Sequence, residues 1–314
     1  MFKLRLDTST LLLALLLAPF AAVSQVAPAA EDPLPRARSL LSSGRLAESE
    51  SVLHEYLNSN PSSADAHFLL GYVLFRDQKA NESLAEFTAG AKYRHPKVDD
   101  LKIVASDYVL LGAYSDADKW FSAVVKEKPD DADAWYLLGR TKYNENIFAE
   151  AIPIFEHALT LRPKYIEAEN NLGLSWRELN QNDKAQAAFQ TAIDWQGDTP
   201  LDAQPFLNLG TLLADQNEFA KALPYLTRAA AMSPDNPEVH EELGKALLAL
   251  NDLLKAQSEL ERAVALAPGT SSLHFKLAQI YRKEGLSERS RQEFAICEKL
   301  NSTHSSSKTP NPPR

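Results

Sequence analysis

The residues best suited to chemistry in this 314-residue chain are seven histidines, one cysteine and scattered carboxylates. The nearest match to a catalytic motif is His240-Glu241-Glu242. In the zinc motif H-E-x-x-H, a second histidine follows one helical turn after the first, so that both imidazoles face the metal. Gly244 occupies that position here. The sequence therefore predicts no zinc site at His240.

The other reactive groups are equally isolated. Cys297 is the single cysteine, so the chain can form neither an internal disulfide nor a paired-cysteine metal site. The sequence contains no nucleophile elbow and no glycine-rich phosphate loop. His67, His240 and His274 recur at one position of a repeated pattern, which indicates packing. We therefore expect a non-catalytic protein that holds no cofactor and no metal.

The elements that carry these residues follow a 34-residue period. One step is 37 residues long, which places a three-residue insertion near 196–200. A second position is always Ser or Ala, and a bulky Leu or Phe follows it four residues later, as Ala151 and Phe155 illustrate. Large side chains on two close helices need small residues opposite them. The first position holds only Gly or Ala in all eight copies: Ala37, Gly71, Ala105, Gly139, Gly173, Gly210, Gly244 and Ala278.

One copy of the pattern, residues 131–163, predicts two amphipathic helices, 132–145 and 148–161. Truncating either Trp135 or Phe155 to Ala is expected to cost about 3–5 kcal/mol, because both occupy packing positions. Prolines recur after the second helix of most copies and would stop it. The residues predicted to cap the helices that follow are Ser63, Asp130, Asp235 and Ser271, with Asp32 ahead of the first helix.

The order Trp135, Leu138-Gly139, Ala151, Phe155, Ala158, Pro163 resembles the tetratricopeptide repeat, a 34-residue helix–turn–helix unit. One position departs from this pattern, because Lys142 stands where the repeat has an aromatic residue. The resemblance covers about residues 30–304. It implies an all-α, right-handed superhelical solenoid of about eight repeats, whose first helices line a concave groove that binds peptides or partner helices.

The resemblance also implies which positions line that groove. In repeats two to five they carry five aromatic residues and four cations within an otherwise acidic protein. Aromatic and Arg side chains dominate binding hot spots. The Lys and Asn set with which chaperone-binding members grip a terminal carboxylate is incomplete, because Ser106 and Leu137 stand where two Asn residues belong. The candidate groove residues are Phe68, Tyr72, Phe75, Arg76, Lys102, Tyr136, Arg140, Tyr143, Asn170 and Arg177.

The two ends of the chain differ from the repeats. Residues 1–24 are typical of a secretory signal, with Lys3 and Arg5 ahead of a twelve-residue apolar run and a small-residue cleavage pattern. An uncleaved signal anchor is the alternative. Residues 302–314 are predicted to form a disordered tail. We therefore expect an exported protein, either periplasmic or secreted. Its net charge of −9 argues against nucleic acid as a partner.

Together these features predict an interaction scaffold that binds a protein or peptide in the groove, and the hypothesis for the ligand is an acidic segment that carries apolar anchors. In the alternative interpretation of the groove, its aromatic residues pack on neighbouring repeats and its Arg residues are ordinary solvated charges. A second hypothesis is an architectural protein of the cell envelope that self-associates through its terminal repeats. A third, an enzyme whose site no motif reveals, is disfavoured because no His, Cys or carboxylate cluster is visible.

Overall fold

The computed structural model describes residues 32–306, with side chains placed as far as Ser302. Over this range the chain is all-α, with sixteen helices and no strand. The predicted signal segment and residues 307–314 of the predicted tail lie outside the described residues. The last helix continues to Ser306, so the tail cannot begin at Ser302 as predicted.

The helices form eight consecutive helix–turn–helix pairs. The prediction for residues 131–163 is confirmed, with the end of the first helix one residue earlier than expected. The first five pairs are α1 Pro33–Ser42 and α2 Leu46–Ser59, α3 Ala64–Arg76 and α4 Ala80–Ala91, α5 Val98–Leu110 and α6 Tyr114–Glu127, α7 Ala132–Asn144 and α8 Phe148–Leu161, α9 Ile166–Glu178 and α10 Asn182–Asp194. The last three are α11 Gln204–Asp215 and α12 Phe219–Met232, α13 Pro237–Ala249 and α14 Leu253–Leu266, α15 Ser271–Lys283 and α16 Ser287–Ser306.

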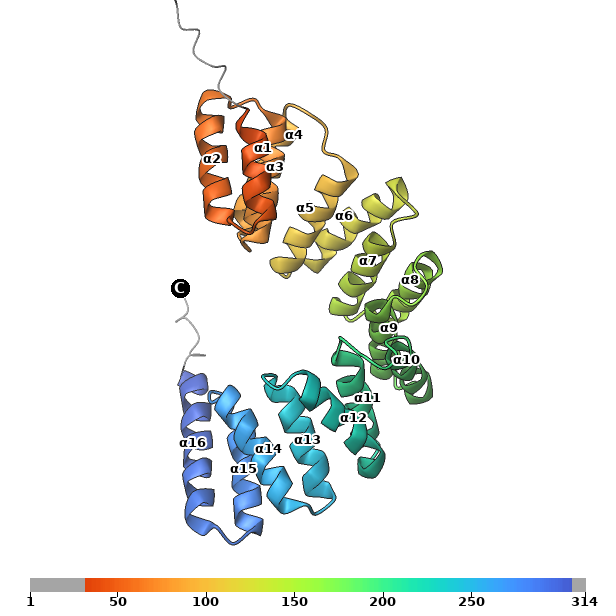
Figure 1. Cartoon of the computed structure of the whole chain (residues 1–314), viewed down its shortest axis with the longest axis vertical. Helices are drawn as coiled ribbons and strands as arrows, with labels where there is room; N and C mark the ends of the chain where they lie inside the picture. Colours follow the sequence, from red (N-terminus) through yellow and green to blue (C-terminus); the bar gives the residue numbers. More distant parts are fainter. Residues whose placement is uncertain (1–31, 307–314) are drawn as a thin grey trace, which may run out of the picture.

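The pairs stack into a superhelical solenoid that curves as an open arc (Figure 1). Each helix contacts mainly its partner and the next helix along the chain. Along the middle of the arc, α5 and α7 lie on the inner side while α6, α8 and α10 lie on the outer side. The first helices of the repeats therefore line the concave face.

Close packing inside each pair explains the invariant small position. A Cβ atom built on Gly139 would lie 2.6 Å from the Phe155 ring, and one on Gly173 would lie 2.6 Å from the Phe189 ring. Phe155 and Phe189 are fully buried. No repeat accommodates anything larger than Ala at this position, because the bulky residue of the second helix fills the space.

We expect Gly139→Val to lower the free energy of unfolding by about 1–3 kcal/mol, since it overpacks the contact with Phe155. Gly269→Val is the control. Gly269 lies in a turn and has no atom within 4 Å of an added Cβ, so its replacement should change stability by less than about 0.5 kcal/mol. Urea denaturation of both variants provides the comparison. Equal midpoints would contradict the packing explanation.

The turn between the two helices of every repeat contains one residue in the left-handed region. Its φ lies between 58° and 77° in all eight repeats. Gly adopts this conformation without strain, and Asn tolerates it better than other residues do. The eight residues are Gly44, Gln78, Gly112, Asn146, Asn180, Asn217, Asn251 and Gly285. Gln78 is the one occupant that is neither Gly nor Asn.

Helix caps follow the predicted chemistry but not always the predicted residue. Asp32 accepts a hydrogen bond from the Leu34 N–H, and Ser63 accepts one from the Ala66 N–H, as expected. The other three predicted caps are wrong by one residue. The caps are Asp131 in place of Asp130, Asn236 in place of Asp235, and Thr270 in place of Ser271, and Thr270 makes no side-chain hydrogen bond.

Polar residues close the two ends of the described stack. Arg36 stands where repeats two to eight place a buried or nearly buried Leu or Val, such as Leu70 and Leu138. In the last repeat, Glu298 stands where Leu57 and Val125 are buried in earlier ones. Solvated outer faces of this kind are what terminal repeats of a solenoid require.

The predicted insertion forms the link between α10 and α11. The Gln196 side chain organises this link. Its Oε1 accepts hydrogen bonds from the N–H groups of Leu201 and Asp202 at 3.1 and 2.8 Å, and its Nε2 donates to the Asp202 carbonyl at 3.1 Å. The longer link is therefore a loop held by hydrogen bonds with one side chain, and α10 still contacts α11 directly.

Candidate functional site

Three of the histidines that could suggest catalysis instead form hydrogen bonds that hold neighbouring segments of the repeat together. The Nε2 atoms of His67, His240 and His274 each donate to the carbonyl of the proline six residues earlier, at 2.9–3.0 Å. In each case Nδ1 lies 2.6 Å from a glutamate on the second helix of the same repeat. Trp135 occupies the same position, and its Nε1 donates to the Pro129 carbonyl at 2.9 Å. The predicted packing role is confirmed.

Nothing around His240 forms a metal site. Its ring contacts Glu259 and the Pro234 carbonyl, whereas the adjacent Glu242 pairs with Lys245 at 2.8 Å. Among residues 32–302, no group of three or more His, Cys, Asp or Glu side chains could hold a metal ion. Cys297 is half-buried, whereas Ala158 and Ala263 at the same position of their repeats are fully buried.

The concave face of repeats two to four contains a hollow of about 230 Å³, which we call the central hollow. It opens between α3, α5 and α7, where the groove positions of three repeats meet. Leu110 is 50% exposed, a high value for a large apolar side chain. Arg140, which lines the same hollow, is also exposed. The residues that define the central hollow are Phe75, Val109, Leu110, Leu137, Arg140 and Asn144.

Several predicted groove residues are accessible on this face. Tyr72 and Phe75 stack on each other, with ring centroids 6.4 Å apart, and both are half-exposed. Arg76 is exposed and has no hydrogen-bond or ion-pair partner among the described residues. The Arg140 guanidinium lies 5.6 Å from the Tyr136 ring centroid, and Arg177 lies beside Glu178 at 3.4 Å.

Other predicted groove residues are engaged inside the protein. Asn170 is 4% exposed, and its side-chain oxygen accepts a hydrogen bond from Asn208 in the next repeat at 2.8 Å. The prediction of a groove contact there is wrong, because the next first helix covers the position. Lys102 donates to Asp131, the cap of α7, at 2.8 Å. Burial opposes ionisation of Asp131, but hydrogen bonds from Lys102 and the Ala134 N–H outweigh it and hold the pKa of Asp131 below its ordinary value.

The two tyrosines of repeat four connect the groove to the core. Tyr136 packs on Phe155 and Tyr165, with ring centroids 6.1 and 5.0 Å away, and Tyr143 packs on Phe148 at 5.2 Å. Burial raises the pKa of both the Tyr136 and Tyr143 hydroxyls above its ordinary value. Both side chains therefore combine packing with a polar edge on the concave face.

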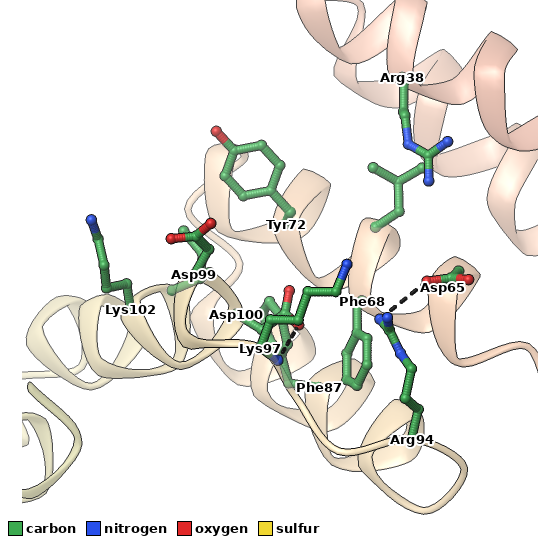
Figure 2. A pocket seen from close by; sticks show the side chains of 12 residues that line it. Arg38, Asp65, Phe68, Tyr72, Phe87, Arg94, Lys97, Asp99, Asp100 and Lys102 are labelled. Carbon is green, nitrogen blue, oxygen red and sulfur yellow. Dashed lines mark hydrogen bonds and ion pairs between the residues drawn. The ribbon is translucent and has the colours of Figure 1, made fainter. Parts of the chain in front are cut away.

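A second hollow, of about 450 Å³, lies nearer the start of the array between α1, α3 and α5. We call it the N-terminal hollow, and Figure 2 shows it from close by. Sequence reasoning identified only Phe68, Tyr72 and Lys102 from its lining. Phe68 itself is 4% exposed and forms part of the wall. The cationic and apolar residues of its lining include Arg38, Phe68, Leu69, Tyr72, Lys97 and Ile103.

A buried carboxyl on α5 contacts α4. Asp107 is fully buried, and its Oδ2 lies 2.6 Å from the Ser83 hydroxyl oxygen. The same hydroxyl lies 2.8 Å from the Gly71 carbonyl, which can only accept. Ser49 and Ser290 donate to the equivalent carbonyls of their own repeats. Burial raises the pKa of Asp107 to about 7, although the hydrogen bond from the Ser83 hydroxyl acts in the opposite direction.

The fold and the groove together define a helical-repeat protein built to present a concave surface. Profiles of the tetratricopeptide repeat match residues 34–96, 105–166 and 170–237, and a further profile of the same repeat matches residues 213–280. The chain belongs to the tetratricopeptide repeat family. Within residues 32–306, no helix is sufficiently long and apolar to cross a membrane.

Solved structures share this fold at low sequence identity. A tetratricopeptide repeat protein from Parabacteroides merdae aligns with a TM-score of 0.64 and 18% identity, over 79% of this chain and 97% of that one. The APC/C hetero-tetramer Cut9–Hcn1 aligns with a TM-score of 0.60 and 18% identity, over 85% of this chain and 52% of that one. PilW, a type IV pilus biogenesis factor, aligns with a TM-score of 0.56 and 21% identity, over 62% of this chain and 90% of that one.

Curated relatives match over their repeat segments. The mouse protein O-mannosyl-transferase TMTC1 is 28% identical over 47% of this chain, and FlbA of Caulobacter vibrioides is 27% identical over 40% of it. The chain spans 16% and 20% of the length of these two proteins. A peroxisomal targeting signal receptor of Candida albicans is 39% identical over 21% of this chain and 12% of its own length.

Proposed function

We propose that this protein is a non-catalytic interaction scaffold that binds a protein or peptide along the concave face of repeats two to five. The central hollow carries this proposal. It joins an apolar floor from three repeats to the exposed cation Arg140, with the unpaired Arg76 on the same face. The charge favours an acidic ligand, and the floor favours apolar anchors.

The scaffold is already ordered before a partner arrives. Asn170 and Asn208 fix neighbouring repeats, and His67, His240 and His274 each bond the two helices of their own repeat. A preformed surface loses little conformational entropy on binding, so its contacts contribute more of their energy to affinity. The signal-like segment at residues 1–24 supports action outside the cytoplasm, either in the periplasm or as a secreted protein.

We expect the double substitution Arg76→Glu with Arg140→Glu to weaken partner binding roughly tenfold or more, since it reverses both groove cations. Lys126→Glu with Arg228→Glu is the matched control, because both residues are exposed cations on second helices. Retention of proteins from an envelope or secretome extract provides the comparison. Equal retention by the two double variants would place the contact away from the groove.

The alternative, self-association through the terminal repeats, gives a different result in the same preparation. A molecular mass that rises with concentration in sedimentation, and that the groove substitutions leave unchanged, would favour the architectural role. Truncation at residue 286, which removes α16, should then abolish the concentration dependence.

A further inference from the structure

The N-terminal hollow arises where the repeat geometry is broken. Helix α4 has 12 residues, whereas α2, α6, α8, α12 and α14 have 14. The link from α4 to α5 consequently spans residues 92–97, longer than the four-residue link 60–63 before it. Departures from a regular pattern in an otherwise consistent fold concentrate at functional sites.

Gly90 and Arg94 shape the wall of this hollow. Gly90 stands where repeats four to seven have Ala, and a Cβ there would lie 2.6 Å from the Phe68 ring. The glycine therefore lets Phe68 stack on Phe87, with centroids 5.9 Å apart. Past the shortened helix, the Arg94 guanidinium covers the Phe68 ring at 4.9 Å and pairs with Asp65 at 3.1 Å. Its Nε is buried and has no partner.

The mouth of the hollow carries two cations that form no ion pair within the described residues. Arg38 extends toward it from α1 and Lys97 from the start of α5 (Figure 2). Both are exposed, and neither side chain has a hydrogen-bond or ion-pair partner among the described residues. The lining also holds three carboxylates: Asp65 pairs with Arg94, Asp100 accepts from the Lys97 backbone N–H at 2.8 Å, and Asp99 is exposed.

We infer that the N-terminal hollow binds an acidic–apolar pair of residues in the partner peptide. The partner's carboxylate lies between Arg38 and Lys97, and its neighbouring apolar side chain packs on Leu69 and Ile103, which are partly exposed. This inference rests on the proposed function. Cations beside an apolar wall attract a carboxylate more strongly than cations in open water, because the wall lowers the local dielectric.

The distance between the two hollows sets the spacing of the anchor residues along the partner peptide. Phe68 and Phe75 are seven residues apart on α3 and line the N-terminal and central hollows respectively. Seven residues of α-helix rise about 10 Å. An extended peptide covers that distance in about three residues. The partner should therefore carry a second apolar anchor about three to five residues from its acidic–apolar pair.

An array of acetylated, amidated octapeptides tests the first anchor directly. The peptides have the form Gly-Ser-Gly-X-Z-Gly-Ser-Gly, in which X and Z run through all residue pairs. We expect the parent protein to retain pairs of Asp or Glu with Phe, Leu or Ile at least about fivefold better than the same pairs with Lys. The variant Arg38→Glu with Lys97→Glu should reverse this preference, because it reverses the charge that selects the ligand.

Two further variants separate the possible results. Lys126→Glu with Arg228→Glu should keep the parent preference, and Leu69→Ala should keep the charge preference while losing selection for large apolar residues. The Arg38/Lys97 variant should keep the parent's unfolding midpoint, since both side chains are exposed and unpaired. An unchanged acidic preference in that variant would overturn the inference and leave the scaffold proposal standing. Absence of any preference in the parent, together with equal partner retention by the groove variants, would overturn both.

Discussion

Replacing Phe155 with Ala is expected to lower the free energy of unfolding by about 3–5 kcal/mol. Phe155 is fully buried, meets the backbone at Gly139 and packs on Tyr136. Its removal leaves a cavity at the centre of repeat four that neither helix can fill without moving. Because each repeat is stabilised mainly by its neighbours, the loss should also weaken the adjoining repeats.

Urea denaturation followed by tryptophan fluorescence measures this effect. The control is Phe275→Ala, since Phe275 is 45% exposed and its truncation should cost about 1 kcal/mol or less. An equal shift of the midpoint in the two variants would show that the position of Phe155 in the core has been misjudged. Trp135→Ala should cost less than the 3–5 kcal/mol expected from sequence, because that side chain is only half-buried.

The stability of the protein should fall as the pH rises from about 4 to 7, and Asp107 should supply much of the change. Its pKa is about 7 in the folded chain and 3.8 ordinarily, so over this range the folded state binds a proton that the unfolded state has released. A single such group lowers stability by up to about 1.4 kcal/mol per pH unit. Glu169 adds a dependence of the same sign, because burial first and the charge of Glu156 second raise its pKa to about 7.

Asp107→Asn separates the two contributions. An Asn side chain can accept a hydrogen bond from the Ser83 hydroxyl as the Asp107 carboxyl does, and it does not ionise. We expect this variant to match the parent near pH 5, exceed it in stability at pH 8 and show a shallower dependence between them. Adding Glu169→Gln should remove most of the remaining slope. Parallel pH profiles for Asp107→Asn and the parent would show that Asp107 is ionised throughout.

Most of the fold follows from the 34-residue period because each position is defined by contacts within one repeat. Gly139 opposite Phe155 is visible as spacing alone, and the predicted helix 148–161 is confirmed. The caps were harder to place, since Asp130 and Asp131 offer the same side chain and only the backbone conformation of the turn selects between them.

The candidate site was less predictable because exposure depends on neighbouring repeats. Phe68, Lys102 and Asn170 occupy equivalent positions, yet the first forms a wall, the second pairs with the cap of α7 and the third bonds the next repeat. Three residues of the N-terminal hollow, Phe68, Tyr72 and Lys102, were predicted as groove residues, but the hollow itself was not. Its signals in the sequence are Gly90, in a position that repeats four to seven give to Ala, and Pro96, which follows the second helix one residue later in the period than Pro61 or Pro129 does.

The uniform turn inside each repeat has a consequence for how such a chain can change over generations. Every turn reverses direction through one left-handed residue at the same point of the period. A genetic crossover between two of these turns would therefore join a first helix to a second helix in phase. The product would gain or lose whole repeats, and the new helix pair would still place a small residue of its first helix against a bulky residue of its second helix. Length can thus evolve by duplication and loss, independently of point substitutions that alter the groove.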